Sequence, residues 1–130
     1  MSVIQDSDNT KAIKMCLSCS KICLETLHHC LNNGKNGLVG GMHLALLQQC
    51  ADACQLSGRL MIAESRFHHQ ACELSFEICQ ACAEECERFE NDPLLARCAD
   101  VCRKCAESCR AMAGMTVRIP QEEIARASMT

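Results

Sequence analysis

The spacing of the cysteines constrains the fold of this chain more than any other feature. Within each of the segments 72–86 and 98–109 they recur at steps of three, four and seven, and residues so spaced lie above one another on a helix. Similar steps occur at two places earlier in the chain. The full set is Cys16, Cys19, Cys23, Cys30, Cys50, Cys54, Cys72, Cys79, Cys82, Cys86, Cys98, Cys102, Cys105 and Cys109. The pattern predicts four helices that each carry a row of thiols on one face.

The breaks between these rows predict where the helices begin and end. Gly and Asn are frequent between 32 and 41, and Asn91-Asp92-Pro93 forms a second break, since Gly and Asn end helices and Pro begins them. A polar segment, 1–10, ends in three residues that are good N-caps. The junction near 65 has neither Gly nor Pro and must be a tight turn. The expected helices span about residues 11–31, 42–64, 66–90 and 93–113.

Short connections make consecutive helices antiparallel. The sequence therefore predicts an all-α fold, an antiparallel up-down-up-down four-helix bundle with a cysteine-lined core. We place this bundle at residues 10–113 of a single domain, 1–130, because a chain of this length forms one core. Residues 114–130 are expected to form a C-terminal tail.

The composition of the chain indicates what fills its core, which partners it can bind and in which cellular compartment it is found. The chain has three Phe, no Trp and no Tyr, so its fourteen Cys and seven Met are the candidates to fill the core. The net charge is only -3, and without a basic cluster we expect no nucleic-acid or membrane partner. The N-terminus lacks the pattern of a signal peptide, and no stretch approaches the roughly 18 apolar residues that span a bilayer. We therefore expect a cytoplasmic protein, because thiols stay reduced there.

Three ordinary explanations fit the cysteines poorly. Single buried cysteines fill cores as small hydrophobes, but cores are ordinarily built from Leu, Ile and Val rather than from fourteen thiols. Disulfides within one helix would close loops too short to constrain the unfolded chain. A redox CxxC lies at a helix start beside a sheet, whereas Cys79–Cys82 and Cys102–Cys105 lie inside expected helices.

Soft-metal binding explains the rows better. The Cβ atoms of residues four apart on a helix are roughly 5–6 Å apart, so two thiols can lean together onto one ion. The pairs with this spacing are Cys19/Cys23, Cys50/Cys54, Cys82/Cys86, Cys98/Cys102 and Cys105/Cys109. Zinc prefers separate four-sulfur sites formed by loops, whereas continuous rows suit Cu(I), which soft thiolates select. If every thiolate bridges two ions, the array is neutral and holds roughly 14 Cu(I) per chain, a capacity that indicates storage rather than an enzyme.

Helix direction predicts where metal enters the bundle. The start of the first helix, the junction of the second and third, and the end of the fourth share one end, where the rows finish in Met61, His68 and Met112. Thioether and imidazole are neutral copper ligands, so we expect these three residues to form a Met/His mouth that passes ions inward. Core filling is an equally good explanation of the two methionines. We expect the opposite end, with His43 and Phe89, to be closed.

The cysteine rows resemble those of the cytosolic copper storage proteins, a family earlier labelled ferredoxin-like. The resemblance covers about residues 10–113. It is carried by the rows Cys16-x2-Cys19-x3-Cys23, Cys79-x2-Cys82-x3-Cys86 and Cys98-x3-Cys102-x2-Cys105-x3-Cys109. It implies a homotetramer of bundles that binds many Cu(I) ions in a bacterial cytosol, with storage on the fourteen cysteines and uptake through the Met/His mouth.

This chain has fewer thiols than the richest members of that family. Leu47 and Ser57 hold inward positions of the second helix, and Thr26 and Ser75 hold similar positions in the first and third. We therefore expect gaps in the copper array.

Two other functions stay open. An iron–sulfur electron carrier needs four-cysteine sets that converge from loops, and the ferredoxin spacing C-x2-C-x2-C-x3-C is absent from the sequence. A zinc or general thiol buffer would use the same sulfurs and would differ in the metal that copurifies with the protein.

Overall fold

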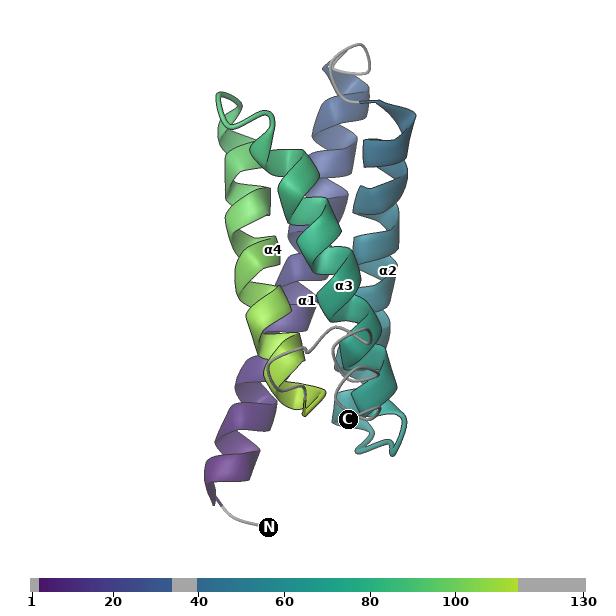
Figure 1. Ribbon diagram of the computed structural model, residues 1–130, viewed down its shortest axis with the longest axis vertical. Helices are drawn as coiled ribbons and strands as arrows, with labels where there is room; N and C mark the ends of the chain where they lie inside the picture. Colours follow the sequence, from purple (N-terminus) through teal and green to yellow (C-terminus); the bar gives the residue numbers. More distant parts are fainter. Residues whose placement is uncertain (1–2, 34–39, 115–130) are drawn as a thin grey trace, which may run out of the picture.

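The computed structural model describes residues 3–33 and 40–114, which form four α-helices (Figure 1). They are α1 (Val3–Asn32), α2 (Gly41–Ile62), α3 (His68–Glu87) and α4 (Pro93–Met112). Helices α1 and α3 each pack beside α2 and α4, and consecutive helices run in opposite directions. The predicted all-α, up-down-up-down four-helix bundle is confirmed.

The helix bounds differ most from the prediction at the start of α1. The sequence places three cap-type residues, 8–10, before the helix, but α1 begins at Val3 and runs through them. The preference of such residues for a cap is worth only about 1 kcal/mol, so it does not by itself stop a helix. All other helix bounds lie within three residues of the expected ones.

The connection between α2 and α3 ends α2 without a glycine. Glu64 has a positive φ of 54°. The backbone N–H groups of Glu64 and Ser65 donate to the carbonyls of Met61 and Leu60 at 3.1 and 2.9 Å. This pair of bonds is the Schellman arrangement, in which glycine usually takes the left-handed position. Because a glutamate stands there instead, nothing in the composition of this junction marks the turn.

Asp92 joins α1 to the start of α4 at the other end of the bundle. Its Oδ1 accepts hydrogen bonds from the backbone N–H groups of Leu94 and Leu95 at 3.0 and 3.2 Å, so it caps α4, and Pro93 begins the helix as predicted. Its Oδ2 lies 2.9 Å from Nε2 of His29, near the end of α1. The bond to His29 and the bonds from the backbone lower the pKa of Asp92 to about 2.

Gly114 has a φ of 70° and follows the end of α4, which lies within one residue of the expected end at 113. The rest of the expected tail, 115–130, lies outside the described residues. Residues 34–39, which include several of the Gly and Asn residues expected to end the first helix, lie outside them too.

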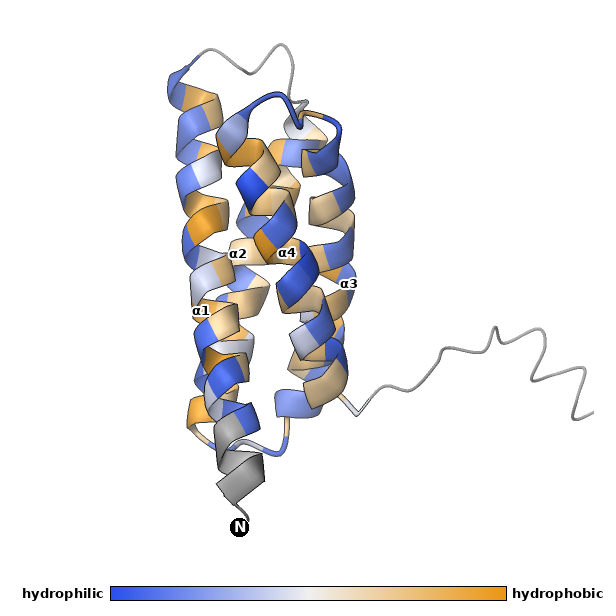
Figure 2. Cartoon of the chain, turned by 90° about the vertical axis from the view of Figure 1, so that its left-hand side faces the viewer, coloured by the Kyte–Doolittle hydropathy of each residue, from blue (hydrophilic) through white to orange (hydrophobic). Residues whose placement is uncertain are grey.

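The interior of the bundle is built from sulfur and small side chains. All fourteen cysteines are at most 1% exposed, and alanines such as Ala83 and Ala106 lie between them. Few larger apolar side chains are buried among the described residues: they are Ile22, Leu47, Met61, Phe76 and Leu95. Figure 2 shows hydrophilic and hydrophobic residues interleaved along every helix, as expected when one face is buried. None of the four described helices combines the length and the hydropathy needed to cross a membrane.

Candidate metal centre

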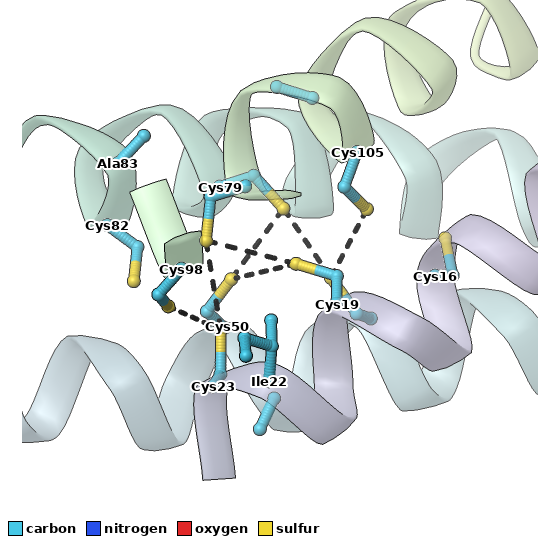
Figure 3. Packing of buried hydrophobic residues seen from close by; sticks show 14 of the residues in the cluster. Cys16, Cys19, Ile22, Cys23, Cys50, Cys79, Cys82, Ala83, Cys98 and Cys105 are labelled. Carbon is cyan, nitrogen blue, oxygen red and sulfur yellow. Dashed lines mark hydrogen bonds between the residues drawn. The ribbon is translucent and has the colours of Figure 1, made fainter. Parts of the chain in front are cut away.

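All fourteen cysteines are free thiols, and every helix contributes some of them to one buried interior. Helices α1, α3 and α4 provide four each, and α2 provides two. In Figure 3 the sulfurs of Cys19, Cys50 and Cys79 point toward one another from three different helices. The predicted inward rows are confirmed, and no disulfide joins any of these thiols.

A chain of short sulfur contacts connects α2, α3 and α4. The Sγ atom of Cys79 lies 3.6 Å from that of Cys50 and 3.5 Å from that of Cys54. The Sγ atom of Cys54 also lies 3.7 Å from that of Cys105 in α4. The two thiols of α2 therefore link the rows of α3 and α4, although α2 has the fewest cysteines.

Helix α1 joins the same network through sulfur contacts with α4 and α2. The Sγ atoms of Cys19 and Cys23 lie 3.9 and 3.8 Å from that of Cys102 in α4. Cys23 also lies 4.0 Å from Cys98, and Cys19 lies 4.0 Å from Cys50 in α2. Sulfurs of all four helices are thus in contact through their neighbours.

The short contacts differ from the pairs predicted on single helices. Among those pairs, Cys105 and Cys109 make a direct contact, with their Sγ atoms 3.9 Å apart. The other short sulfur contacts join different helices, as between Cys16 and Cys109 at 3.7 Å. A metal ion would therefore be held mainly between helices rather than along one of them.

Three groups of Sγ atoms within the described residues have every member within 4.8 Å of the others. The groups are Cys19, Cys50, Cys54 and Cys79; Cys19, Cys23, Cys50 and Cys102; and Cys16, Cys105 and Cys109. The two four-sulfur groups share Cys19 and Cys50. A thiolate that belongs to two groups can bridge two ions, so the arrangement favours a connected cluster over separate single-ion sites.

The sulfur separations suit coordination of a soft metal ion. Two thiolates held ~2.3 Å from one ion lie roughly 3.8 Å apart at a tetrahedral centre and roughly 4.0 Å apart at a trigonal one. The observed contacts run from 3.5 to 4.0 Å. The thiols are therefore already spaced as metal ligands, and this spacing serves zinc and copper alike.

Hydrogen bonding and burial shift the thiol pKa values in opposite directions. The pKa of Cys98 lies well below that of an ordinary thiol because Cys102 and Cys23 hydrogen-bond to it and favour its thiolate. The pKa of Cys102 lies well above it because hydrogen bonding to Cys19 and burial favour the neutral thiol. Protons are thus unevenly shared in the interior, and a cation that binds a protonated thiol displaces its proton.

The predicted gaps in the thiol lining are present and are occupied by Ser, Thr and Leu side chains. Ser57 and Ser75 are fully buried, and their hydroxyls hydrogen-bond to each other at 2.6 Å. Thr26 donates to the backbone carbonyl of Ile22 at 2.7 Å, and Leu47 is fully buried. These side chains interrupt the rows of sulfur, so the lining is not uniform along the bundle.

The predicted mouth residues belong to the end of the bundle at which α2 ends and α3 begins. Met61 is buried, and Met112 is half-buried against the core. His68 is half-buried, and its Nδ1 donates to the backbone carbonyl of Ser65 at 2.8 Å. That bond keeps the proton of the neutral ring on Nδ1, so Nε2 can act as an acceptor or a metal ligand.

His43, at the opposite end, is a candidate that the sequence prediction missed. It is 2% exposed, its Nε2 lies 3.2 Å from Sγ of Cys86, and its ring stacks on Phe89 with centroids 5.8 Å apart. Burial lowers the pKa of His43, so the ring is neutral. Its Nδ1 has no hydrogen-bond partner among the described residues, which costs about 1–3 kcal/mol. The signal in the sequence is its position seven residues before Cys50, on the same face of α2.

A four-helix bundle with a connected, buried lining of thiols defines a class of protein, one that holds several soft metal ions between its helices. The comparison with known families narrows this class. The chain belongs to the copper storage protein family, Csp, whose sequence profile matches residues 5–114. The resemblance seen in the cysteine rows is confirmed.

Individual relatives agree with this assignment. The cysteine-rich protein YhjQ of Bacillus subtilis strain 168 is 37% identical in a match of 97 aligned positions that covers 70% of this chain and 89% of that protein. The Nmul_A1745 protein of Nitrosospira multiformis is 38% identical, with a TM-score of 0.77 over 84% of this chain and 97% of its own. The Cu(I)-bound copper storage protein BsCsp3 is 32% identical, with a TM-score of 0.71 over 82% of this chain and 98% of its own.

Proposed function

We propose that this chain stores many Cu(I) ions on the thiolates of its fourteen cysteines. The observation that supports this most directly is the overlap of the two four-sulfur groups at Cys19 and Cys50. Shared thiolates let ions accumulate side by side, and soft sulfur selects Cu(I). One thiolate for each monovalent ion leaves the buried array neutral, which avoids the large cost of unpaired buried charge. The idealised capacity is roughly 14 Cu(I) per chain, and the gaps in the thiol lining should reduce this number.

In this proposal the bound ions are cargo, and the protein is not an enzyme. A catalytic metal site keeps one coordination position open for water or substrate. Here every cysteine is buried, and those at the centre of the bundle contact further thiols, which would occupy the positions around each ion. The arrangement suits retention of metal rather than turnover of a substrate.

The Met/His mouth is the proposed route for copper. Met61 and Met112 supply thioethers, and the acceptor nitrogen of His68 supplies an imidazole, all neutral ligands for Cu(I). Neutral ligands bind the ion without the charge of a thiolate, so they can pass it onward. Met61 stands seven residues after Cys54 on α2, which places it in line with the thiol row.

We further propose that the protein acts in the cytosol, as a homotetramer. Free thiols persist in a reducing compartment. Leu24 and Leu31 of α1, Leu56 of α2 and Leu74 of α3 are exposed, and leucines on the outer faces of a bundle suit contacts with further copies of the chain. Light scattering of the reduced protein during gel filtration measures the mass, and a monomer would contradict the tetramer.

Anaerobic titration tests the storage function. The reduced protein is titrated with Cu(I) in the presence of a chromophoric Cu(I) chelator, and the free thiols are counted before and after loading. We expect uptake of many ions per chain, with the loss of titratable thiols following the copper bound. Saturation at one or two ions would contradict storage.

Zinc is the second candidate cargo, because the four-sulfur groups also have the ligand number of a tetrahedral zinc site. Zinc is divalent, so a bridged array with one ion for each thiolate would carry a large positive charge. Loading with each metal and then challenging with the other distinguishes them. We expect Cu(I) to displace zinc, and retention of zinc under excess Cu(I) would favour a zinc buffer.

A further inference from the structure

An imidazole is a poor choice for filling the interior at the end of the bundle where α2 begins. His43 is 2% exposed, and its Nδ1 is unpaired among the described residues. An apolar side chain would fill the space without leaving a polar atom unpaired, as Leu47 does one turn further along α2. Packing alone therefore does not explain why an imidazole stands at this position.

The other ring nitrogen faces a thiol. Nε2 of His43 lies 3.2 Å from Sγ of Cys86, which is one of the fourteen fully buried thiols of the interior. The ring is thus in direct contact with a thiol of the buried lining. One ion with bonds of ~2.0 Å to nitrogen and ~2.3 Å to sulfur would hold the two atoms roughly 3.7 Å apart, so a shift of about half an ångström would admit it.

The position of His43 matters because a bridged array needs a different ligand at its end. Inside the array each thiolate can bind ions on both sides, but the last ion lacks a thiolate on its outer side. A neutral imidazole completes the coordination of that ion without adding a negative charge to a buried place. Phe89, stacked on the ring with an interplanar angle of 17°, holds the ring in place.

We propose that His43 and Cys86 together bind a Cu(I) ion, which terminates the thiol array at the end opposite the Met/His mouth. The nitrogen ligand is Nε2, and the proton of the ring stays on Nδ1. This inference rests on the proposed copper storage function and extends the ligand set from thiols to a buried imidazole. The chain then has neutral ligands at both ends of its core.

Nuclear magnetic resonance of the unaltered, reduced full chain tests this directly. With ¹⁵N-labelled protein under anaerobic conditions, the ring nitrogens of each histidine are followed while Cu(I) is added. We expect a large change in the Nε2 resonance of His43 during loading and none for the exposed His28, which serves as an internal control. This readout needs no mutation, so it does not depend on how a variant folds.

Variants supply a second measurement. We expect His43→Leu to lower the number of chelator-resistant Cu(I) ions by about one per chain, and His43→Cys to restore it, because a thiolate can replace the imidazole as a soft ligand. His28→Leu is the matched control and should leave the count unchanged. Circular dichroism compares the folding of each variant with that of the parent.

The outcomes separate this inference from the storage function. If the unaltered chain binds many Cu(I) ions while the His43 resonances stay in place, the inference is wrong and storage stands. A full count of ions in a folded His43→Leu variant would lead to the same conclusion. If the unaltered chain saturates at one or two ions, both proposals fall.

Discussion

Cys19 contacts thiols of two other helices, Cys50 and Cys102, and belongs to both four-sulfur groups. We expect Cys19→Ala to lower the Cu(I) capacity by roughly two ions, because two groups lose a ligand at once. Cys72 belongs to none of the three groups, so Cys72→Ala, which also removes a buried thiol, should cost roughly one ion or fewer. Anaerobic titration against a Cu(I) chelator measures both losses. Equal losses would contradict the sharing of thiolates.

Asp92 is the residue from which we expect a clear effect of acid on stability. Its carboxylate pairs with His29 and caps α4, and its pKa is about 2, below the usual 3.8. A lowered pKa means that the folded state favours the carboxylate, so this stabilisation is complete above about pH 4 and is lost as the pH falls toward about 2. Asp92→Ala should therefore reduce the free energy of unfolding at neutral pH by about 1 kcal/mol, and much less near pH 2.

Urea unfolding of the metal-free, reduced protein at several pH values measures this difference. Glu107→Ala is a suitable control, since this exposed carboxylate pairs with Arg110 on the surface of α4 and such pairs contribute little. The free energies of unfolding of Asp92→Ala and the parent could instead differ by the same amount down to the lowest pH. That result would show that the charge of Asp92 does not contribute to stability.

At the level of the helices and their connections, Glu64 is held in an unfavourable backbone conformation. Its φ of 54° costs a residue with a side chain about 1–2 kcal/mol, whereas glycine adopts it freely. Glycine also makes the unfolded chain more flexible, which offsets part of the gain. We expect Glu64→Gly to raise the free energy of unfolding of the metal-free protein by about 0.5–1 kcal/mol.

The neighbouring Ala63 provides the matched control for that change. Its φ of -78° lies in the right-handed helical region, so glycine has no conformational advantage there. We expect Ala63→Gly to lower the free energy of unfolding by about 0.5–1 kcal/mol. Urea unfolding of both variants gives the comparison, and changes of the same sign would rule out strain at Glu64.

The sequence predicted the helices better than their contacts. The number of helices, their order and their inward faces follow from the steps between cysteines, because positions on a helix face repeat regularly. The contacts between sulfurs also depend on how far each helix is shifted and rotated against its neighbours, and spacing within one helix carries no such information. Spacing therefore predicts pairs on single helices, whereas contacts such as Cys54–Cys79 follow only from the structure.

His43 shows the same limit at one end of the bundle. Its spacing from Cys50 predicts an inward position, which the structure confirms. The contact with Cys86, 43 residues away in sequence, depends on how α2 and α3 pack. The sequence does not mark the turn at Glu64 either, since the backbone there adopts a glycine-like conformation without a glycine.

For the molecule as a whole, copper loading should depend on pH. The pKa values of Cys102 and Cys54 are raised by hydrogen bonding to neighbouring thiols and by burial, so these thiols hold protons at neutral pH. Each Cu(I) that binds must displace such protons, and binding therefore weakens as the pH falls. We expect the copper retained against a chelator to decrease from about pH 8 to about pH 6. Fewer than one proton should be released per ion, because thiols such as Cys98 favour the thiolate already.

Chelator competition at several pH values, corrected for protonation of the chelator, measures the retention. A pH indicator in weakly buffered solution measures the released protons. Retention that did not change with pH, with no proton release, would mean that the thiols are already ionised in the empty protein.

The contact between Cys16 and Cys109 spans 93 positions of the chain, nearly its full described length. An ion between these sulfurs would fasten the first helix to the last, and only the closed bundle could hold it, so each filled position makes opening rarer. Proteases that cut transiently opened chains would then remove empty molecules and spare full ones. Bound copper would thus lengthen the lifetime of the protein molecules that store it.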